Sequence, residues 1–383
     1  MHVLRSILLA TDLWPLNSEP ESAAVRLATE FDSQTSLLHV LEPMPHWPVT
    51  LDQEQQQAAG LLQQVAERLA SQHIKIAGTH VVVGSAADMI VQRAREIDVD
   101  LVIVGAGEAC SSGLCSVGPV AEFVVEHASQ PVLVVRPSDP QLGFRKILCP
   151  VDQSRVAAHG LRNALRLAQV FGGEMVVLTV IPEVGWLTAA TETKQLVDAK
   201  IEYELKSCEE FETFLETIPT NGVKVSREVR RGVPHREVAA AVQDHQIDLI
   251  VMGATGRTGL VRVLLGSTTR QLLRHLPCSM LIVKQEDLIE ELTERDLDAI
   301  DLLMAEGQEL LAADCHRQAI EKFRHVLDRN PFHIAAVEGL AEANAKLGQR
   351  EKAHLYRRRA QRLRSHASFS LIGSAEGHGH LEQ

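Results

Sequence analysis

The stretch that decides the fold reads GVPHREVAAAVQDHQIDLIVMGATG at residues 232–256, and the chain contains a second version of it. That version, GSAADMIVQRAREIDVDLVIVGAGE at residues 84–108, aligns with it without a gap. Each version has apolar residues at helical spacing, then a short continuous apolar run, then a turn with glycine. This order predicts a helix, a buried strand and a loop at the carboxyl end of that strand.

The sequence on either side of this stretch is also duplicated. RSILLATD at residues 5–12 returns as RKILCPVD at 145–152, and SQPVLVVRP at 129–137 returns as HLPCSMLIVK at 275–284. The period of roughly 140 to 148 residues is the size of a whole domain. We therefore predict two related domains, residues 1–140 and 141–285.

Each half alternates apolar strand patterns with helical ones. In the second half, strands are expected at 146–151, 174–180, 223–230, 248–253 and 279–284. Helical spacing lies between them, including a long helix at about 192–216. Such alternation predicts an α/β fold, with two doubly wound parallel five-stranded sheets in tandem and helices on both faces. Ligands of such sheets bind beyond the carboxyl ends of the strands.

Composition and charge narrow the function classes. A chain of 383 residues with 45% apolar and 23% charged residues is typical of a soluble protein of two or three domains. Its net charge of −12 argues against nucleic-acid binding, which needs basic surface. The six cysteines include no C-x-x-C pair, and no Cys/His cluster has zinc spacing, so we expect a reducing cytoplasm. No apolar run is long enough for a membrane span, and the first residues do not resemble a signal peptide.

The loop GATGRTGLVRVLLGST, residues 253–268, follows the fourth strand of the second half. Gly253 and Gly256 permit close backbone approach, and Gly266 opens the next helix. A helix start offers unpaired N–H groups and a positive dipole end, which suit an anion. Glycines are also common in ordinary turns, so a phosphate site and a plain turn are equal alternatives on these grounds.

Hydroxyl residues follow the last glycine of this loop. Ser267, Thr268 and Thr269 are able to cap the helix and to donate hydroxyls to a bound anion. The loop is not a P-loop, because no lysine follows its glycines.

The four-point spacing of this loop resembles the ATP-binding signature of the universal stress protein family. Its positions are Gly253, Gly256, Gly266 and Ser267. The flanking pattern is similar too: a first strand that ends in Asp152, LTVIPE after the second strand, G-V-P before the third helix and RHLPCSMLIVK at the end. The resemblance covers residues 1–284, so the chain resembles a tandem of two universal stress protein domains.

That resemblance implies a sheet order of 3-2-1-4-5 in each half and ATP, with or without Mg²⁺, at the carboxyl edge. Asp152 and Val180, placed after the first and second strands, would then hold the nucleoside. The phosphates would be held by Gly253, Gly256, Gly266 and Ser267, with Thr268 beside them.

The first half departs from the signature. Gly105 and Gly118 match two of its glycines, but Glu108 and Pro119 replace the second glycine and the serine. A carboxylate repels phosphate, and proline lacks an N–H group and a hydroxyl. Asp12 is kept, so nucleoside-like binding and a purely structural role stay open for this half. We expect a degenerate structural partner.

The C-terminal segment, residues 286–365, has helical patterns and no strand pattern. GQELLAADCHRQAIEKFRHVLDRNP is followed 34 residues later by a second stretch of the same plan. The segment resembles tetratricopeptide repeats at these positions: Gly307, Leu310, Ala319, Phe323, Pro331, Leu340, Ala341, Ala353 and Ala360. Peptide binding or assembly and a plain helical cap are equal alternatives. Residues 366–383 are polar and are expected to be disordered.

Other features carry weaker hypotheses. YRRRAQRLR at 356–364 is basic and would suit an acidic partner, although a solvated helix face is the simpler reading. Cys110 and Cys115 flank the degenerate loop, but nothing nearby would lower a thiol pKa. His235 and His275 are interpreted as surface histidines.

The sequence therefore favours an ATP-binding, stress-responsive regulatory protein that holds one nucleotide in its second half. The halves are expected to form an intramolecular pseudo-dimer through residues 132–135 and 280–283, and the helices to contact a protein partner or a second copy. The alternative is a non-catalytic scaffold or sensor that acts through the helices without ATP. Any ATP hydrolysis should be slow, since no metal-binding carboxylate pair or base lies near the loop.

Overall fold

The structure is a computed structural model of the chain. It describes residues 4–13, 19–42, 50–107, 116–137, 143–182, 194–220, 222–255, 265–284, 294–329 and 333–373. The chain divides into two compact units, Ser6–Asp287 and a helical unit of Leu288–Gln383 together with Met1–Arg5. The first unit contains both versions of the duplicated sequence.

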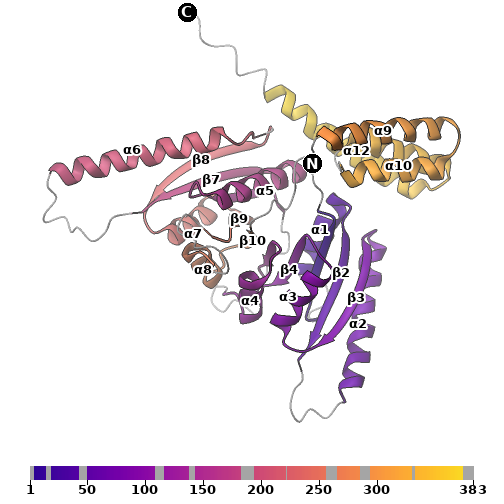
Figure 1. Ribbon diagram of the computed structural model, residues 1–383, viewed down its shortest axis with the longest axis horizontal. Coiled ribbons are helices and arrows are strands. Elements are labelled where there is room, and N and C mark those ends of the chain that lie inside the picture. The colour runs from indigo at the N-terminus through magenta and orange to yellow at the C-terminus, as the bar shows by residue number, and fades with distance from the viewer. Residues whose placement is uncertain are drawn as a thin grey trace, which may run out of the picture. The chain divides into compact units, whose positions relative to one another are not determined.

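The two halves of the first unit have the same series of elements (Figure 1). The first half comprises β1 (Ser6–Ala10), α1 (Glu19–Phe31), β2 (Gln34–Leu41), α2 (Leu51–Ser71), β3 (Lys75–Val83), α3 (Ala86–Glu96), β4 (Leu101–Gly105), α4 (Pro119–His127) and β5 (Val132–Val135). The second half comprises β6 (Lys146–Pro150), α5 (Arg155–Phe171), β7 (Glu174–Ile181), α6 (Lys194–Glu216), β8 (Lys224–Arg231), α7 (Pro234–His245), β9 (Leu249–Gly253), α8 (Ser267–Arg274) and β10 (Ser279–Val283).

These strands form one ten-stranded sheet in the order β3-β2-β1-β4-β5-β10-β9-β6-β7-β8. Within each half the paired strands are parallel and the order is 3-2-1-4-5, so the predicted fold is confirmed. The halves meet through β5 and β10, which are antiparallel. The predicted pairing of the last strands is therefore confirmed, and the two five-stranded sheets are halves of one sheet.

A pseudo-two-fold relation between the halves passes between Leu133 and Leu281. These leucines are equivalent in the duplicated sequence and lie opposite each other across the β5–β10 pair. On one face of the sheet, the equivalent residues Phe31 of α1 and Phe171 of α5 make an edge contact with ring centroids 6.5 Å apart. Because β5 and β10 run in opposite directions, the carboxyl ends of the strands in the two halves lie at opposite edges of the sheet.

Polar contacts on the other face join α4 of the first half to the end of the second. Arg270 of α8 forms an ion pair with Glu126 of α4 over 2.9 Å. Lys284, just after β10, donates a hydrogen bond from Nζ to the carbonyl of Val125 in the last turn of α4. Burial lowers the pKa of Lys284 to about 8, although the nearby Glu126 carboxylate opposes that shift.

Helix α5 shows why the local sequence forms these elements. The hydroxyl of Ser154 caps it by accepting a hydrogen bond from the N–H of Ala157 over 3.1 Å. Its apolar face, which includes Leu161 and Ala168, is buried against the sheet. Gly172 ends it in the left-handed conformation at φ 61°.

The G-V-P turn ahead of α7 needs its glycine. Gly232 has φ 139°, and a β-carbon there would lie 2.8 Å from Oε1 of Glu237 in the first turn of α7. Its counterpart Gly84, ahead of α3, has φ 151° and lies against Met89 in the same way. Both halves therefore enter their third helix through the same strained turn.

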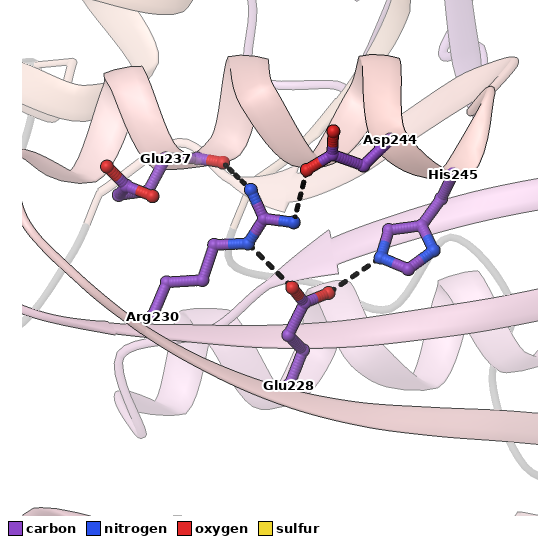
Figure 2. A network of polar contacts seen from close by, with 5 residues as sticks. All are labelled: Glu228, Arg230, Glu237, Asp244 and His245. Atoms are coloured by element: carbon purple, nitrogen blue, oxygen red, sulfur yellow. Dashed lines mark hydrogen bonds and ion pairs between the residues drawn. The ribbon is translucent and has the colours of Figure 1, made fainter.

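A polar network then fixes α7 on the edge strand β8 (Figure 2). Arg230 of β8 donates hydrogen bonds to Glu228 over 2.6 Å and to Asp244 of α7 over 2.8 Å. His245 of α7 lies 2.7 Å from the other carboxylate oxygen of Glu228. Burial acts to raise the pKa of Glu228, but the hydrogen bonds from Arg230 and His245 outweigh it and hold that pKa below its ordinary value.

The helical unit contains α9 (Glu294–Ala312), α10 (His316–Arg329), α11 (Ile334–Lys346) and α12 (Arg350–Gly373). The ring of Phe323 lies so close to two glycines that a β-carbon would fall 2.7 Å from it at Gly307 and 2.6 Å from it at Gly339. Helices are thus confirmed in this segment, and the assignment to tetratricopeptide repeats stays a prediction. Helix α12 runs to Gly373, past the boundary that we expected at residue 365.

Candidate functional site

The candidate site lies at the switch point of the second half, where the strand order reverses between β6 and β9. After β6 the chain turns through Asp152 into α5, and after β9 it leads from Gly253 towards α8. Because β6 and β9 are neighbouring parallel strands, both turns lie at the same edge of the sheet. A doubly wound sheet places its ligand crevice at such a point.

Asp152 has a structural task at this edge. It is half-buried, and its Oδ1 accepts a hydrogen bond from the N–H of Ser154 over 3.1 Å, which shapes the turn into α5. Gln153 between them has φ 59°, and its Nε2 donates to the hydroxyl of Thr179 in β7 over 3.1 Å. The turn is therefore tied to β7, and a ligand would meet a carboxylate held within the turn.

Val180 lies within a strand, so its expected position after the second strand was wrong. It is the penultimate residue of β7 and pairs with Arg230 of β8. Strand β7 ends at Ile181, one residue beyond the strand expected at 174–180, and β8 runs beside it to Arg231. Val180 still lies near the carboxyl end of β7, next in order to β6.

Gly253 is required by packing inside the fold. A β-carbon there would lie 2.7 Å from Cγ1 of Val156 and 3.2 Å from its backbone. Gly160, one turn further along α5, also lies close to β9, since its β-carbon would be 3.3 Å from the nitrogen of Gly253. The sequence pattern explained Gly253 by phosphate approach alone and missed Gly160, whose position inside a helical pattern was the available signal.

Gly266 begins α8 and holds the loop closed. Its N–H donates to the carbonyl of Ala254 over 2.8 Å, and its carbonyl accepts the N–H of Arg270. A β-carbon at Gly266 would make only ordinary contacts, the nearest at 3.4 Å. Packing therefore does not demand this glycine, in contrast to Gly253.

The hydroxyl residues at the start of α8 differ from one another in position. Ser267 is exposed and Thr268 is half-buried, so both are accessible at the helix start. Thr269 is 2% exposed and donates its hydroxyl to the carbonyl of Gly253 over 3.3 Å. The prediction that Thr269 donates to a bound anion was therefore wrong, because this hydroxyl ties α8 to β9.

The opening turn of α8 supplies the anion-binding chemistry. The first N–H groups of a helix have no acceptor within the helix, and they carry the positive end of its dipole. Gly266, which precedes these N–H groups, has no side chain that would block an approaching anion. Gly256 lies in residues 256–264, outside the described part of the chain.

The first half keeps the hydrogen bond between the ends of the loop, but its helix start differs. The N–H of Gly118 donates to the carbonyl of Ala106 over 2.7 Å, as Gly266 does to Ala254. Pro119 is the first residue of α4, so that helix start has one N–H group fewer than α8. Asp12 is exposed after β1, and Glu108 lies outside the described residues.

The fold is a tandem of two α/β domains, of which the second keeps the glycine and serine spacing of the loop and the first alters it. The sequence profile of the universal stress protein family matches residues 4–136 and 143–284. The chain therefore belongs to the universal stress protein family, and each half is one domain of that family.

Individual relatives support the assignment. A universal stress protein of Methanocaldococcus jannaschii is 31% identical over 151 residues, which is 37% of this chain and 83% of that protein. One of Mycolicibacterium smegmatis is 24% identical over 274 residues, 68% of this chain and 90% of its own. The crystal structure of a universal stress protein from Archaeoglobus fulgidus covers 73% of this chain and 98% of its own at a TM-score of 0.53 and 20% identity, which shows the shared fold.

No helix among the described residues is long and apolar enough to cross a bilayer. Nor do they include a group of three or more His, Cys, Asp or Glu side chains placed to hold a metal ion.

Proposed function

We propose that this chain is an ATP-binding, stress-response regulatory protein that holds its nucleotide in the second half. The observation that carries the proposal is the opening turn of α8, which begins beyond the carboxyl end of β9 and is preceded by Gly266, a residue without a side chain. Phosphates would lie at this turn, held by Gly253, Gly256, Gly266 and Ser267 with Thr268 beside them. Asp152 and Val180, on the neighbouring strands, would hold the nucleoside.

The ligand is inferred from the signature of the loop together with membership of the family. The first half is proposed to act as a structural partner, since Pro119 and Glu108 remove a donor and add a negative charge. The helical unit would contact another protein molecule. We expect the protein to act in the cytoplasm by binding ATP, with at most slow hydrolysis.

An exchange of single residues between the halves tests the proposal. Ser267→Pro gives α8 the helix start of α4, and proline is well tolerated at the first position of a helix. The change removes one N–H group and one hydroxyl, so ATP should bind about 10- to 100-fold more weakly in isothermal titration. Gly266→Ala, which fits without a clash, should also weaken binding.

The first half provides the matched control. Gly118→Ala places a β-carbon in the same surroundings, 3.5 Å from the carbonyl of Ala106, and should leave ATP affinity unchanged. Equal loss of affinity from the Gly118 and Gly266 substitutions would contradict a site confined to the second half. No measurable ATP binding by the unaltered protein would favour the alternative, a scaffold that acts through its helices alone.

A further inference from the structure

Within the helical unit, the contact between α10 and α11 covers one face of each of these helices. The equivalent faces of α12 and α9, the last and first helices of the unit, are exposed. Helices α10 and α11 pack together, with Phe323 of α10 against Gly339 of α11. The residues at helical spacing around this contact are also buried: Ile320 and Leu327 on α10, and Ala336 and Ala343 on α11. The contact therefore joins a bulky apolar face to one of small residues.

The repeat of 34 residues places the same face on α12. There the equivalents of Ile320, Phe323 and Leu327 are His354, Arg357 and Gln361, and all three are exposed. This polar face would reject an apolar helix, because its charged groups would lose water without gaining partners. A helix with acidic groups would fit it.

The same repeat places the α11 face on α9. The equivalents of Ala336, Gly339 and Ala343 are Leu302, Ala305 and Glu309, again exposed. Leu302 is 62% exposed, so an apolar side chain stands uncovered at this end. Ala305 is small, which leaves room for the stem of a long side chain where Phe323 lies on Gly339.

The two helices carry opposite charge. Helix α9 contains six acidic residues and one basic residue, whereas α12 contains seven basic residues and one acidic residue. In the register of the α10–α11 contact, Arg357 of one copy would lie on Ala305 of another. Glu309 of that second copy would then lie beside His354 and Arg357.

We propose that α9 of a second copy packs on α12, so that helical units stack end to end and repeat the α10–α11 contact between chains. This inference rests on the proposed role of the helical unit in protein contacts and names the partner as a second copy of this chain. The contact is heterologous, because α12 of one copy packs on α9 of the next. It should weaken as salt screens the charges.

Mixing two single variants of the full-length protein tests the contact. Arg357→Glu reverses a charge on the α12 face and leaves α9 unaltered. Glu309→Lys reverses a charge on the α9 face and leaves α12 unaltered. In sedimentation velocity at about 100 µM, the unaltered protein should assemble, and each variant alone should associate at least ~10-fold more weakly. An equal mixture should assemble again, because the α9 of one variant matches the α12 of the other.

The control is Arg324→Glu, an exposed charge change on α10 at the repeat equivalent of Arg358. It should leave assembly unchanged. A monomeric unaltered protein, or a mixture no more associated than its two components, overturns the inference. ATP titration of the same samples separates this failure from failure of the nucleotide site, which should bind equally well in all three variants.

Discussion

At the residue scale, Gly253 is the position where packing and the ATP signature coincide. Val156 lies so close that a side chain at 253 would force α5 away from β9. Gly253→Ala should lower the free energy of unfolding by about 1–3 kcal/mol. Urea unfolding followed by circular dichroism would measure the change.

The control for this prediction is Gly105→Ala, at the equivalent position of the first half. There a β-carbon would meet only Cγ of Pro20 at 3.4 Å, an ordinary contact. That substitution should cost well under about 1 kcal/mol. Equal destabilisation by both changes would show that the contact with Val156 is not what requires glycine at 253.

The sequence predicted where these residues lie in the fold better than it predicted their contacts. Asp152 and Gly266 lie at the expected edge, because strand ends and loop spacing are local features of the chain. The hydrogen bond from the Thr269 hydroxyl to Gly253 and the close approach of Val156 to Gly253 join different elements of the fold. Local sequence patterns do not predict such tertiary contacts. The position of Val180 inside β7 likewise involves pairing with another strand, β8.

At the element scale, the Glu228 network should make the stability of the contact between α7 and β8 depend on pH. The pKa of Glu228 is lower in the folded protein than its ordinary value of 4.5, so the network stabilises the fold above that pH. The stabilisation is lost as pH falls through the lowered pKa. Glu228→Gln should therefore cost about 1 kcal/mol at neutral pH and much less in acid, measured by denaturant unfolding as pH falls. A cost that stays constant with pH would contradict the account.

Lys284 gives the contact between α4 and β10 a pH dependence of the same sign, but in the alkaline range. Its pKa of about 8 lies below the ordinary 10.5, so between these values the unfolded chain binds more protons than the folded one. Stability from this group therefore rises with pH across that window. Relative to Lys284→Met, the unaltered protein should gain roughly 2 kcal/mol from about pH 7 to about pH 9.5. A difference that does not change with pH would contradict this account, because it would show that the amine is charged and well solvated in the fold.

The elements themselves were predictable where their pattern was local. Buried strands such as β9 and the helical spacing of α5 are visible in the sequence, because one face or a whole run is apolar. The far end of α12 was not, since SHASFSLI has little apolar periodicity although the helix continues through it to Gly373. Local composition there suggested a tail.

At the scale of the whole molecule, the antiparallel β5–β10 pair separates the two candidate edges. The preserved loop of the second half and the altered loop of the first face opposite edges of one sheet, so neither completes the other. The duplication was evident from the repeat, and the shared sheet followed from the apolar last strands. The proposal that each chain binds one nucleotide then depends only on two differences between the halves. These are Ser267 in place of Pro119 and Gly256 in place of Glu108.

Equilibrium titration of ATP against the full-length protein, with stoichiometry as the readout, tests this proposal most directly. The account predicts one ATP per chain, and it predicts that Ser267→Pro weakens that site while Gly118→Ala leaves it intact. Two equivalent ATP molecules per chain, or a single site that survives Ser267→Pro and is lost on Gly118→Ala, would contradict it.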